Sequence, residues 1–479
     1  SYSDTNAKGE GISPAYLIGS IRSLYPKLEI EGGGVRPHKN SINNYCYPEN
    51  PEAGIDLFLE KLVQETEKEH EDILEQADET DAVFGELYSW YLRNPEYRSR
   101  VQKLVQSAFA GKPEDIISQS VAKALYGEVS PYSATRLERF AACAFAHFLQ
   151  YGMKLTERVE YEFKPMDMGN VMHEALESFA EEVRKRGMKW TELTEQERNE
   201  IADRCLDNIV ADYGNTVLKS SARNEYMIER TRRILRRTVW ALQKQLEQGE
   251  FQPEGFEVTF GGGRIDRVDI MEDQNKVYVK VIDYKTGNTS FDLVYLYHGL
   301  QLQLMIYLDG ALRVEQKKYP DKEIIPAGVF YYNIKDPMIQ EKIDADVEAV
   351  SAGLMKELKM NGLVQADPEL VYRMDSSLGS IPVAFNKDGS FRKNSSVADR
   401  TQFAVLGRYV RTKIEKIRSS ILEGDAEVSP YELGKKNACT YCPYMTVCGF
   451  DRRLSGYEFR RLKNFSDEEL WKAFDREAE

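Results

Sequence analysis

The chain has 479 residues, which is enough for two or three domains with a substantial hydrophobic core. Its net charge of −14 excludes a uniformly basic nucleic-acid coat, so any nucleic-acid contact must use local patches or metal-neutralised sites. No apolar stretch approaches the ~20 residues of a membrane span, and the first ten residues are too polar for a signal peptide. We therefore expect a cytoplasmic protein without a membrane partner and, since no initiator methionine is present, a piece of a longer chain.

Residues 1–128 are predicted to form a mostly helical region. Apolar residues recur at helical spacing within 54–76, 82–91 and 97–109. The chain contains no Gly-x-x-x-x-Gly-Lys-Ser/Thr phosphate loop, so it carries no ATPase motor of the P-loop kind. A boundary near residue 128 separates this region from a second domain at 129–479.

The second domain is predicted to begin with a helix that starts near Tyr132. Thr135 and Glu138 have the spacing of a capping box, in which the first residue caps the helix. Phenylalanines at helical spacing continue the pattern as far as Phe148, which places Cys143 inside this helix.

Two further helical segments precede the predicted strands. Residues 168–186 are amphipathic, and His173 lies at the edge of the apolar face. Residues 192–248 are helical and rich in charge, with an arginine cluster at 230–237. We interpret this cluster as a solvated helix face, with DNA contact as the alternative.

Three short runs rich in β-branched residues, 256–260, 264–270 and 276–282, predict consecutive strands with tight connections. Asp266 lies in the second run, and Asp283 directly follows the third. If the second and third strands are antiparallel neighbours, the two acids can lie side by side. An acid at the end of an apolar strand is costly to bury without a purpose, which indicates a functional site.

Asp283 and Lys285 form an Asp-x-Lys pair whose side chains share one face of the strand, while the Tyr284 side chain points away. Two carboxylates can bind a hard divalent cation through oxygen. Such a metal activates water and neutralises phosphate charge, and a nearby lysine can stabilise the attacking hydroxide or the pentavalent phosphorus. The pattern therefore predicts phosphodiester hydrolysis, although Asp-x-Lys by itself is common on protein surfaces.

Downstream of the pair, residues 300–314 predict a helix that carries Gln303 and Tyr307 one turn apart. We expect residues 327–333 to form the last strand of the sheet. Two more helices are expected, at 344–360 and 398–422.

Three cysteines near the C-terminus have the spacing of a metal chelate: Cys439, Cys442 and Cys448. A fourth ligand is needed, and Cys143 is the best candidate. No histidine follows, which favours an all-cysteine [4Fe–4S] cluster, while zinc and unligated thiols remain alternatives. The two remaining cysteines are interpreted as core residues: Cys46 and Cys205.

Six motifs in a fixed order resemble those of the RecB-type nuclease domain of AddB, a subunit of the bacterial AddAB helicase–nuclease. They are the entry segment 132–143, Gly-x-x-x-His at 169–173, the first acidic motif at 263–269, Asp-x-Lys within 282–287, Gln-x-x-x-Tyr at 303–307, and the three C-terminal cysteines. One departure is Ala144, where the family often has proline, but ligation by the preceding thiolate does not require it. Residues 1–128 resemble the end of the helicase-like part of AddB.

The resemblance implies an α/β fold of the PD-(D/E)XK, restriction-endonuclease-like class, with a mixed central sheet, flanking helices and an iron–sulfur staple. It implies that Mg²⁺ (or Mn²⁺) is held by four groups: His173, Asp266, Asp283 and the Tyr284 backbone. Lys285 would stabilise the nucleophile or the transition state, and Gln303 and Tyr307 would position DNA or the active site. The implied [4Fe–4S] ligands are the four cysteines Cys143, Cys439, Cys442 and Cys448. We interpret Asp269 as a secondary acid that pairs with Arg267.

The implied function is a Mg²⁺-dependent DNA exonuclease domain of a helicase–nuclease that processes double-strand break ends for recombinational repair. Its expected partners are single-stranded DNA ends and an AddA-like helicase–nuclease subunit. One alternative is a stand-alone iron–sulfur nuclease of the CRISPR-adaptation type, against which the long helical N-terminal region argues. The other is a non-catalytic DNA-binding module, which would not need to keep Asp266, Asp283 and Lys285 together.

Overall fold

The chain divides into two compact units, Ser1–Ala110 and Gly111–Glu479. The division falls earlier than the boundary expected near residue 128, because helix α5 (Gln119–Tyr126) packs against helices of the second unit. The computed structural model describes residues 16–27, 50–67, 79–108, 116–127, 133–156, 165–212, 221–261, 263–339, 346–454 and 456–478.

The described part of the first unit is helical, as the sequence predicts. Its helices are α1 (Tyr16–Leu24), α2 (Pro51–Glu67), α3 (Glu79–Arg93) and α4 (Pro95–Ala108). Phe58 is fully buried and stacks on Phe84 with ring centroids 4.8 Å apart. Apolar side chains of α2, α3 and α4 therefore share one small core.

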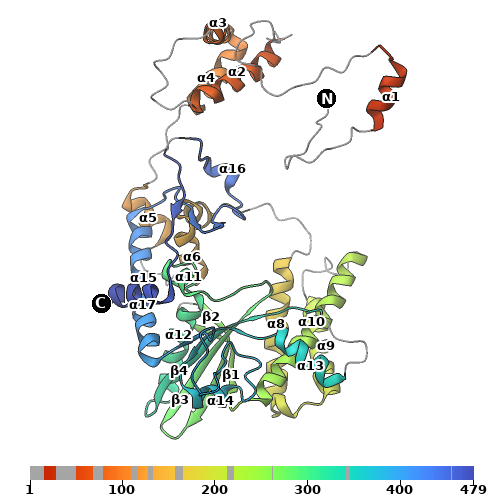
Figure 1. The fold of residues 1–479 in the computed structure, drawn as a ribbon, viewed down its shortest axis with the longest axis vertical. Coiled ribbons are helices and arrows are strands. Elements are labelled where there is room, and N and C mark those ends of the chain that lie inside the picture. Colours follow the sequence, from red (N-terminus) through yellow and green to blue (C-terminus); the bar gives the residue numbers. More distant parts are fainter. Residues whose placement is uncertain are drawn as a thin grey trace. The chain divides into compact units, whose positions relative to one another are not determined.

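A six-stranded mixed sheet forms the centre of the second unit, in the order β1-β2-β3-β4-β5-β6 (Figure 1). The strands are β1 (Gln252–Phe260), β2 (Gly263–Asp273), β3 (Lys276–Lys285), β4 (Glu323–Asn333), β5 (Asn361–Gln365) and β6 (Val397–Ala398). β1, β2 and β3 are antiparallel neighbours, and β4 joins β3 in parallel.

The expectation that residues 327–333 form the last strand is wrong, because β5 pairs with β4 and β6 pairs with β5. The two added strands are only five and two residues long. Runs of this length carry no periodicity that distinguishes a strand from a loop. β5 forms by pairing with the edge of β4, and β6 then pairs with β5.

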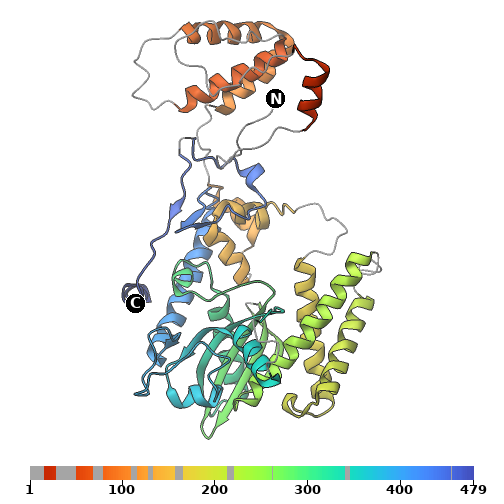
Figure 2. The same cartoon turned by 45° about the vertical axis from the view of Figure 1, so that its right-hand side comes forward.

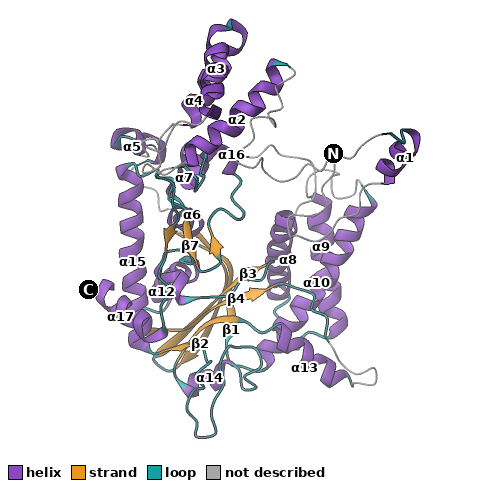
Figure 3. Cartoon of the chain, turned by 45° about the horizontal axis from the view of Figure 1, so that its top comes forward, coloured by secondary structure: helices purple, strands orange, loops and turns teal. Residues whose placement is uncertain are grey.

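Helices cover both faces of the sheet, so the expected mixed sheet with flanking helices is confirmed (Figures 1 and 3). One face packs against α8 (Pro165–Lys185), α9 (Glu195–Asp212) and α10 (Ala222–Glu247), which form the yellow and green helical layer in Figure 2. The other face packs against α12 (Gln303–Lys318). The hydrophobic core on that side also includes residues of α5, α6 (Ala134–Ala142), α15 (Arg400–Glu423) and α17 (Asp467–Ala478). Alternation along β3 separates the two cores: Val277, Val279 and Val281 face α12, whereas Tyr278, Ile282 and Tyr284 face α8.

The predicted helix through Cys143 is interrupted at that residue. α6 ends at Ala142, Cys143 is extended with φ −165° and ψ 117°, and α7 (Ala144–His147) begins directly afterwards. The Phe145 amide donates a hydrogen bond to the Glu427 carbonyl, so a distant segment redirects the chain at this point.

The predicted capping box of Thr135 and Glu138 is also wrong. The N-cap is Ser133, whose hydroxyl accepts a hydrogen bond from the Arg136 amide. Ser133 lies one helical turn before Arg136, which is the spacing that the hydroxyl needs to cap the first turn. Glu138 is thereby left available for a contact in another helix.

The smaller elements of the second unit are the π-helical turn Phe148–Gly152, the 3₁₀ turn Trp190–Glu192, α11 (Leu293–Tyr297), α13 (Val347–Glu357), α14 (Pro368–Met374) and α16 (Met445–Cys448). A second, three-stranded sheet has the order β8-β7-β9 and is made of β7 (Tyr431–Leu433), β8 (Lys436–Asn437) and β9 (Arg460–Arg461). Across the described ranges, no helix combines the length and the hydropathy needed to cross a lipid bilayer.

Candidate active site

Asp266 and Asp283 lie on neighbouring antiparallel strands. Arg267 of β2 pairs with Ile282 of β3, so the next step of the register sets Asp266 opposite Asp283. Asp266 Oδ2 also accepts a hydrogen bond of 2.7 Å from the Tyr284 amide. Both acids are buried, with exposed fractions of 8% and 1%. The structure therefore places the two predicted acids side by side.

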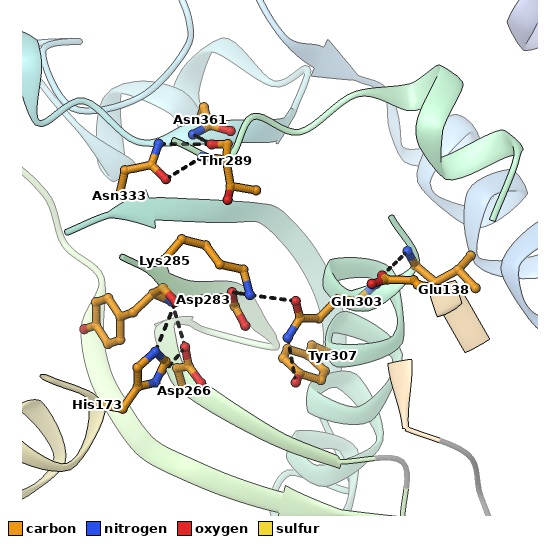
Figure 4. A network of polar contacts seen from close by, with 12 residues as sticks. Glu138, His173, Asp266, Asp283, Lys285, Thr289, Gln303, Tyr307, Asn333 and Asn361 are labelled. Carbon is orange, nitrogen blue, oxygen red and sulfur yellow. Dashed lines mark hydrogen bonds and ion pairs between the residues drawn. The ribbon is translucent and has the colours of Figure 1, made fainter. Parts of the chain in front are cut away.

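His173 of helix α8 contacts Asp266, the first of the two acids (Figure 4). Its Nδ1 lies 3.3 Å from Asp266 Oδ2, and its Nε2 lies 3.1 Å from the Tyr284 carbonyl oxygen. The Tyr284 side chain packs in the core beneath α8, so only its backbone faces the site. All four groups expected to bind a metal, His173, Asp266, Asp283 and the Tyr284 carbonyl, thus lie at one end of β3.

Glu257 of β1 is a member of this site that the sequence pattern did not reveal. Its Oε1 lies 3.7 Å from His173 Nδ1, and its Oε2 lies 2.5 Å from Arg264 Nε. His173, Glu257 and Asp266 offer ligand atoms within 4.8 Å of one another, and they are the one such group among the described residues. Glu257 has φ +48°, a left-handed conformation that is uncommon for a residue with a side chain. The sequence around Glu257 alternates between polar and apolar residues as in an ordinary strand, so nothing there marks Glu257 as part of a site.

Lys285 connects the acids to helix α12 (Figure 4). Its Nζ lies 2.7 Å from Asp283 Oδ2 and donates a hydrogen bond of 2.8 Å to Gln303 Oε1. Gln303 Nε2 donates a hydrogen bond of 2.9 Å to the Tyr307 hydroxyl. The predicted Asp-x-Lys and Gln-x-x-x-Tyr residues therefore form one continuous polar network.

Glu138 of α6 holds the start of α12. Its Oε1 accepts hydrogen bonds from the amides of Leu302, at 2.7 Å, and Gln303, at 3.0 Å. Burial raises the pKa of Glu138 to about 7, although these two hydrogen bonds and the charge of Lys285 lower it. This contact joins positions more than 160 residues apart, and local spacing gives no signal for it.

The segment that follows Lys285 is held by two asparagines. The Thr289 carbonyl accepts hydrogen bonds from Asn333 Nδ2 at 3.0 Å and Asn361 Nδ2 at 2.9 Å (Figure 4). The Thr289 amide donates a hydrogen bond to Asn333 Oδ1 at 3.0 Å. The ends of β4 and β5 therefore fix the chain as it leaves the site.

The pKa values of Asp283 and His173 are both raised at this site, where several acids lie close together. Burial and the charge of Asp266 raise the pKa of Asp283 to about 7, although Lys285 lowers it. Burial lowers the pKa of His173, but hydrogen bonds to Asp266 and Glu257 outweigh this and raise it to about 10. A further positive charge among these acids would relieve their repulsion.

The donor set fits a hard divalent cation. It consists of carboxylate oxygens, a backbone carbonyl and one imidazole, without sulfur. Asp283 Oδ2 is buried and has no hydrogen bond of acceptable geometry, although it forms an ion pair with Lys285. Such an oxygen retains a free lone pair for a metal.

Asp269 has the secondary role that the sequence suggested. Arg267 donates two hydrogen bonds to it, at 2.6 and 2.9 Å, and Lys280 Nζ lies 3.0 Å away. Arg267 also lies over the rings of Trp190 and Phe256. Asp269 is therefore a partner in a buried ion network, separate from the groups that surround His173.

The four predicted cysteine ligands come together at the break after α6. Burial and the charges of Cys143, Cys442 and Cys448 raise the pKa of Cys439 to about 11, which reflects the proximity of all four thiols. Cys143 and Cys442 pack in one cluster with Tyr444. Cys205 is a core residue, as predicted, whereas Cys46 lies outside the described residues.

The arginine cluster of α10 is largely neutralised by acids, which supports its interpretation as a solvated face. Arg232 contacts Asp207 at 2.7 Å, and Arg233 contacts Asp336 at 2.6 Å. Arg236 pairs with Asp203.

Comparison with known proteins agrees with this geometry. The family model described as "PD-(D/E)XK nuclease superfamily" matches residues 131–449, a span that contains every site residue named above. Curated relatives named as subunits of an ATP-dependent helicase/deoxyribonuclease match the whole chain. They include proteins of Lachnoclostridium phytofermentans (38% identical), Alkaliphilus metalliredigens (32%) and Thermoanaerobacter sp. (30%). The chain spans 42–43% of the length of these relatives. The chain belongs to the PD-(D/E)XK nuclease superfamily.

Proposed function

We propose that this chain is the metal-dependent deoxyribonuclease part of a helicase–nuclease subunit, and that it degrades single-stranded DNA from an end. The observation that carries the proposal is the convergence of His173, Asp266, Asp283 and the Tyr284 carbonyl beside Lys285. The name of the relatives, which includes both helicase and deoxyribonuclease, supports the same assignment. The biological role would be the processing of double-strand break ends for recombinational repair.

The metal would be Mg²⁺, or Mn²⁺ in its place. His173, Asp266, Asp283 and the Tyr284 carbonyl would hold it, with Glu257 near His173 as an additional acid. A bound divalent ion would activate water and neutralise charge on the scissile phosphate.

Lys285 would stabilise negative charge on the attacking oxygen or on the phosphorus. Gln303 fixes the Lys285 ammonium through a hydrogen bond, and Tyr307 fixes Gln303. A charge held in place before the reaction stabilises a transition state better than one that must reorganise. Tyr307 and Gln303 would also contact DNA as it enters the site.

The four cysteines Cys143, Cys439, Cys442 and Cys448 would hold a [4Fe–4S] cluster. Four cysteines are the common ligand set of such a cluster, and the last histidine of the chain, His298, precedes the three C-terminal cysteines. Such a cluster would join Cys143, before the central sheet, to the C-terminal loop after it.

The partners would be single-stranded DNA ends and an AddA-like helicase–nuclease subunit, in the cytoplasm. The relatives match the chain throughout its length, including residues 1–128, which a stand-alone nuclease of the CRISPR-adaptation type would not need. A non-catalytic DNA-binding module is the remaining alternative.

A cleavage assay with the 479-residue chain tests the proposal. End-labelled single-stranded DNA is incubated with Mg²⁺, with EDTA, and with the variant Asp283→Asn. We expect progressive degradation only by the wild type with Mg²⁺. A circular single strand, which offers no end, should resist degradation. Tight DNA binding by the wild type without cleavage would instead identify a non-catalytic binding module.

A further inference from the structure

We propose that Glu138 is a positioning residue: it fixes the first turn of α12 and thereby holds Gln303 against Lys285. The inference rests on the proposed nuclease function and extends it to a residue outside the metal site. Figure 4 shows the chain of contacts from Glu138 through Gln303 to Lys285.

The first turn of α12 lacks a cap of its own. Its N-cap residue is Leu302, which has no side chain that could accept a hydrogen bond. Glu138 supplies the missing acceptor from α6 and binds the amides of Leu302 and Gln303 with one oxygen. A negative charge at this end also interacts favourably with the helix dipole.

The capped residue is itself part of the polar network at the site. Gln303 Oε1 accepts the hydrogen bond from Lys285, and Gln303 Nε2 donates to the Tyr307 hydroxyl. A shift of the Gln303 backbone would therefore move the acceptor that orients the Lys285 ammonium. Helix α6 leads directly into Cys143, which belongs to the cysteine lobe formed by Cys143, Cys439, Cys442 and Cys448. Glu138 therefore lies between the cysteine lobe and the site.

Glu138 contacts backbone amides and touches none of the groups proposed to bind the metal. Its loss should therefore reduce kcat and leave metal affinity nearly unchanged, with a smaller rise in KM because Gln303 is also proposed to contact DNA. Misplacement of a group by about 1 Å can reduce the rate of an enzyme by about 100-fold. We expect a fall of this order in Glu138→Ala.

Two variants separate positioning from a general loss of stability. Glu138→Gln keeps an oxygen of the same reach for both amides, so it should retain kcat within about fivefold of the wild type. Asp367→Ala is the matched control, because Asp367 also accepts two backbone amides, those of Glu369 and Leu370, at the start of α14. β5 runs from Asn361 beside the site to Gln365, which places Asp367 beyond its far end.

The experiment measures kcat and KM for single-stranded DNA in the 479-residue chain, together with thermal melting and iron content. The expected result is that Glu138→Ala loses kcat, that Glu138→Gln restores it, and that Asp367→Ala lowers melting alone. In a Gln303→Ala background, adding Glu138→Ala should cost much less than it does in the wild type, because both act through one contact.

Three kinetic results would overturn the inference: wild-type kcat in Glu138→Ala, equal loss of kcat in Asp367→Ala, or fully multiplicative losses with Gln303→Ala. Loss of iron in Glu138→Ala would also overturn it, since the effect would then pass through the cysteine lobe. A wild-type chain that does not cleave would refute the proposed function instead, so the two failures are distinguishable.

Discussion

Lys285 Nζ lies 2.7 Å from Asp283 Oδ2, so the cation and the acid of the Asp-x-Lys motif contact each other along one face of β3. The contact follows from strand geometry, because residues i and i+2 point the same way. It balances part of the negative charge that Asp266, Asp283 and Glu257 create at the site. The lysine, the acids and the neighbouring polar clusters can each be tested separately.

Removal of the lysine should separate catalysis from metal binding. We expect Lys285→Ala to reduce the cleavage rate by about 100- to 1,000-fold, the usual effect of losing one preorganised electrostatic group. Calorimetric Mg²⁺ affinity should not fall, because Asp283 loses a competing cation. Lys276→Ala, at the exposed start of the same strand, is the control and should cleave normally. Wild-type cleavage by Lys285→Ala would exclude a role for this lysine.

Glu257 should contribute to metal affinity. Glu257→Gln removes one negative charge beside His173 and Asp266, and groups that orient metal ligands typically contribute about 10- to 100-fold in affinity. Titration with Mn²⁺, followed by electron paramagnetic resonance, should show weaker binding. Glu254→Gln, on the same strand but paired with Lys318, is the matched control. Equal affinities in both variants would place Glu257 outside the metal site.

The cysteine lobe should contain iron. Protein purified without oxygen should absorb near ~400 nm, as iron–sulfur proteins do. Cys439→Ser should lose both iron and thermal stability, because metal binding is coupled to folding. Cys205→Ala, a buried cysteine far from the other thiols in sequence, should keep its iron. Stoichiometric zinc in a colourless protein would contradict the cluster assignment.

The buried ion network of Asp269 should be important for stability. Asp269→Ala leaves Arg267 and Lys280 buried without their shared partner, and such a loss costs roughly 3–5 kcal/mol. Urea unfolding should show this decrease. Glu272→Ala removes the exposed ion pair with Lys322 and one hydrogen bond from the Tyr319 hydroxyl, and it should cost less than about 2 kcal/mol. Similar effects of the two substitutions would count against a buried network.

His147 should make the protein sensitive to mild acid. Burial, and secondarily the charge of Arg136, lowers the pKa of His147 from 6.5 to about 3. Its Nε2 accepts a hydrogen bond from Arg136 Nε at 3.2 Å, which requires the neutral ring. His147 therefore takes up a proton near pH 6.5 in the unfolded chain but stays neutral in the folded chain. The free energy of unfolding consequently decreases as the pH falls from about 6.5 towards 3.

The effect of His147 can be measured between about pH 7 and about pH 5.5. Protonation of His147 in the unfolded state over this interval lowers the free energy of unfolding by about 1 kcal/mol. His147→Gln keeps an acceptor for Arg136 but cannot titrate, so its free energy of unfolding should fall by about that much less. The same pH dependence in both proteins would show that His147 does not contribute.

The elements of the fold were largely predictable, and the errors have specific causes. Helical periodicity identified α8, α10 and α12, and β-branched runs identified β1, β2 and β3. β5 and β6 were missed because they are short and depend on the edge of β4. The break at Cys143 was missed because it is imposed by a hydrogen bond from Phe145 to Glu427, which is distant in sequence.

Local sequence was sufficient for the groups whose placement depends on near neighbours. Asp283 and Lys285 share a face because of strand alternation, and Gln303 and Tyr307 share a face because of the helical repeat. The packed fold was needed to bring Glu257 to His173 and to let Glu138 cap α12. The reason is physical: backbone periodicity fixes the direction of neighbouring side chains, whereas contacts between distant segments are fixed by how helices and strands pack around the two cores.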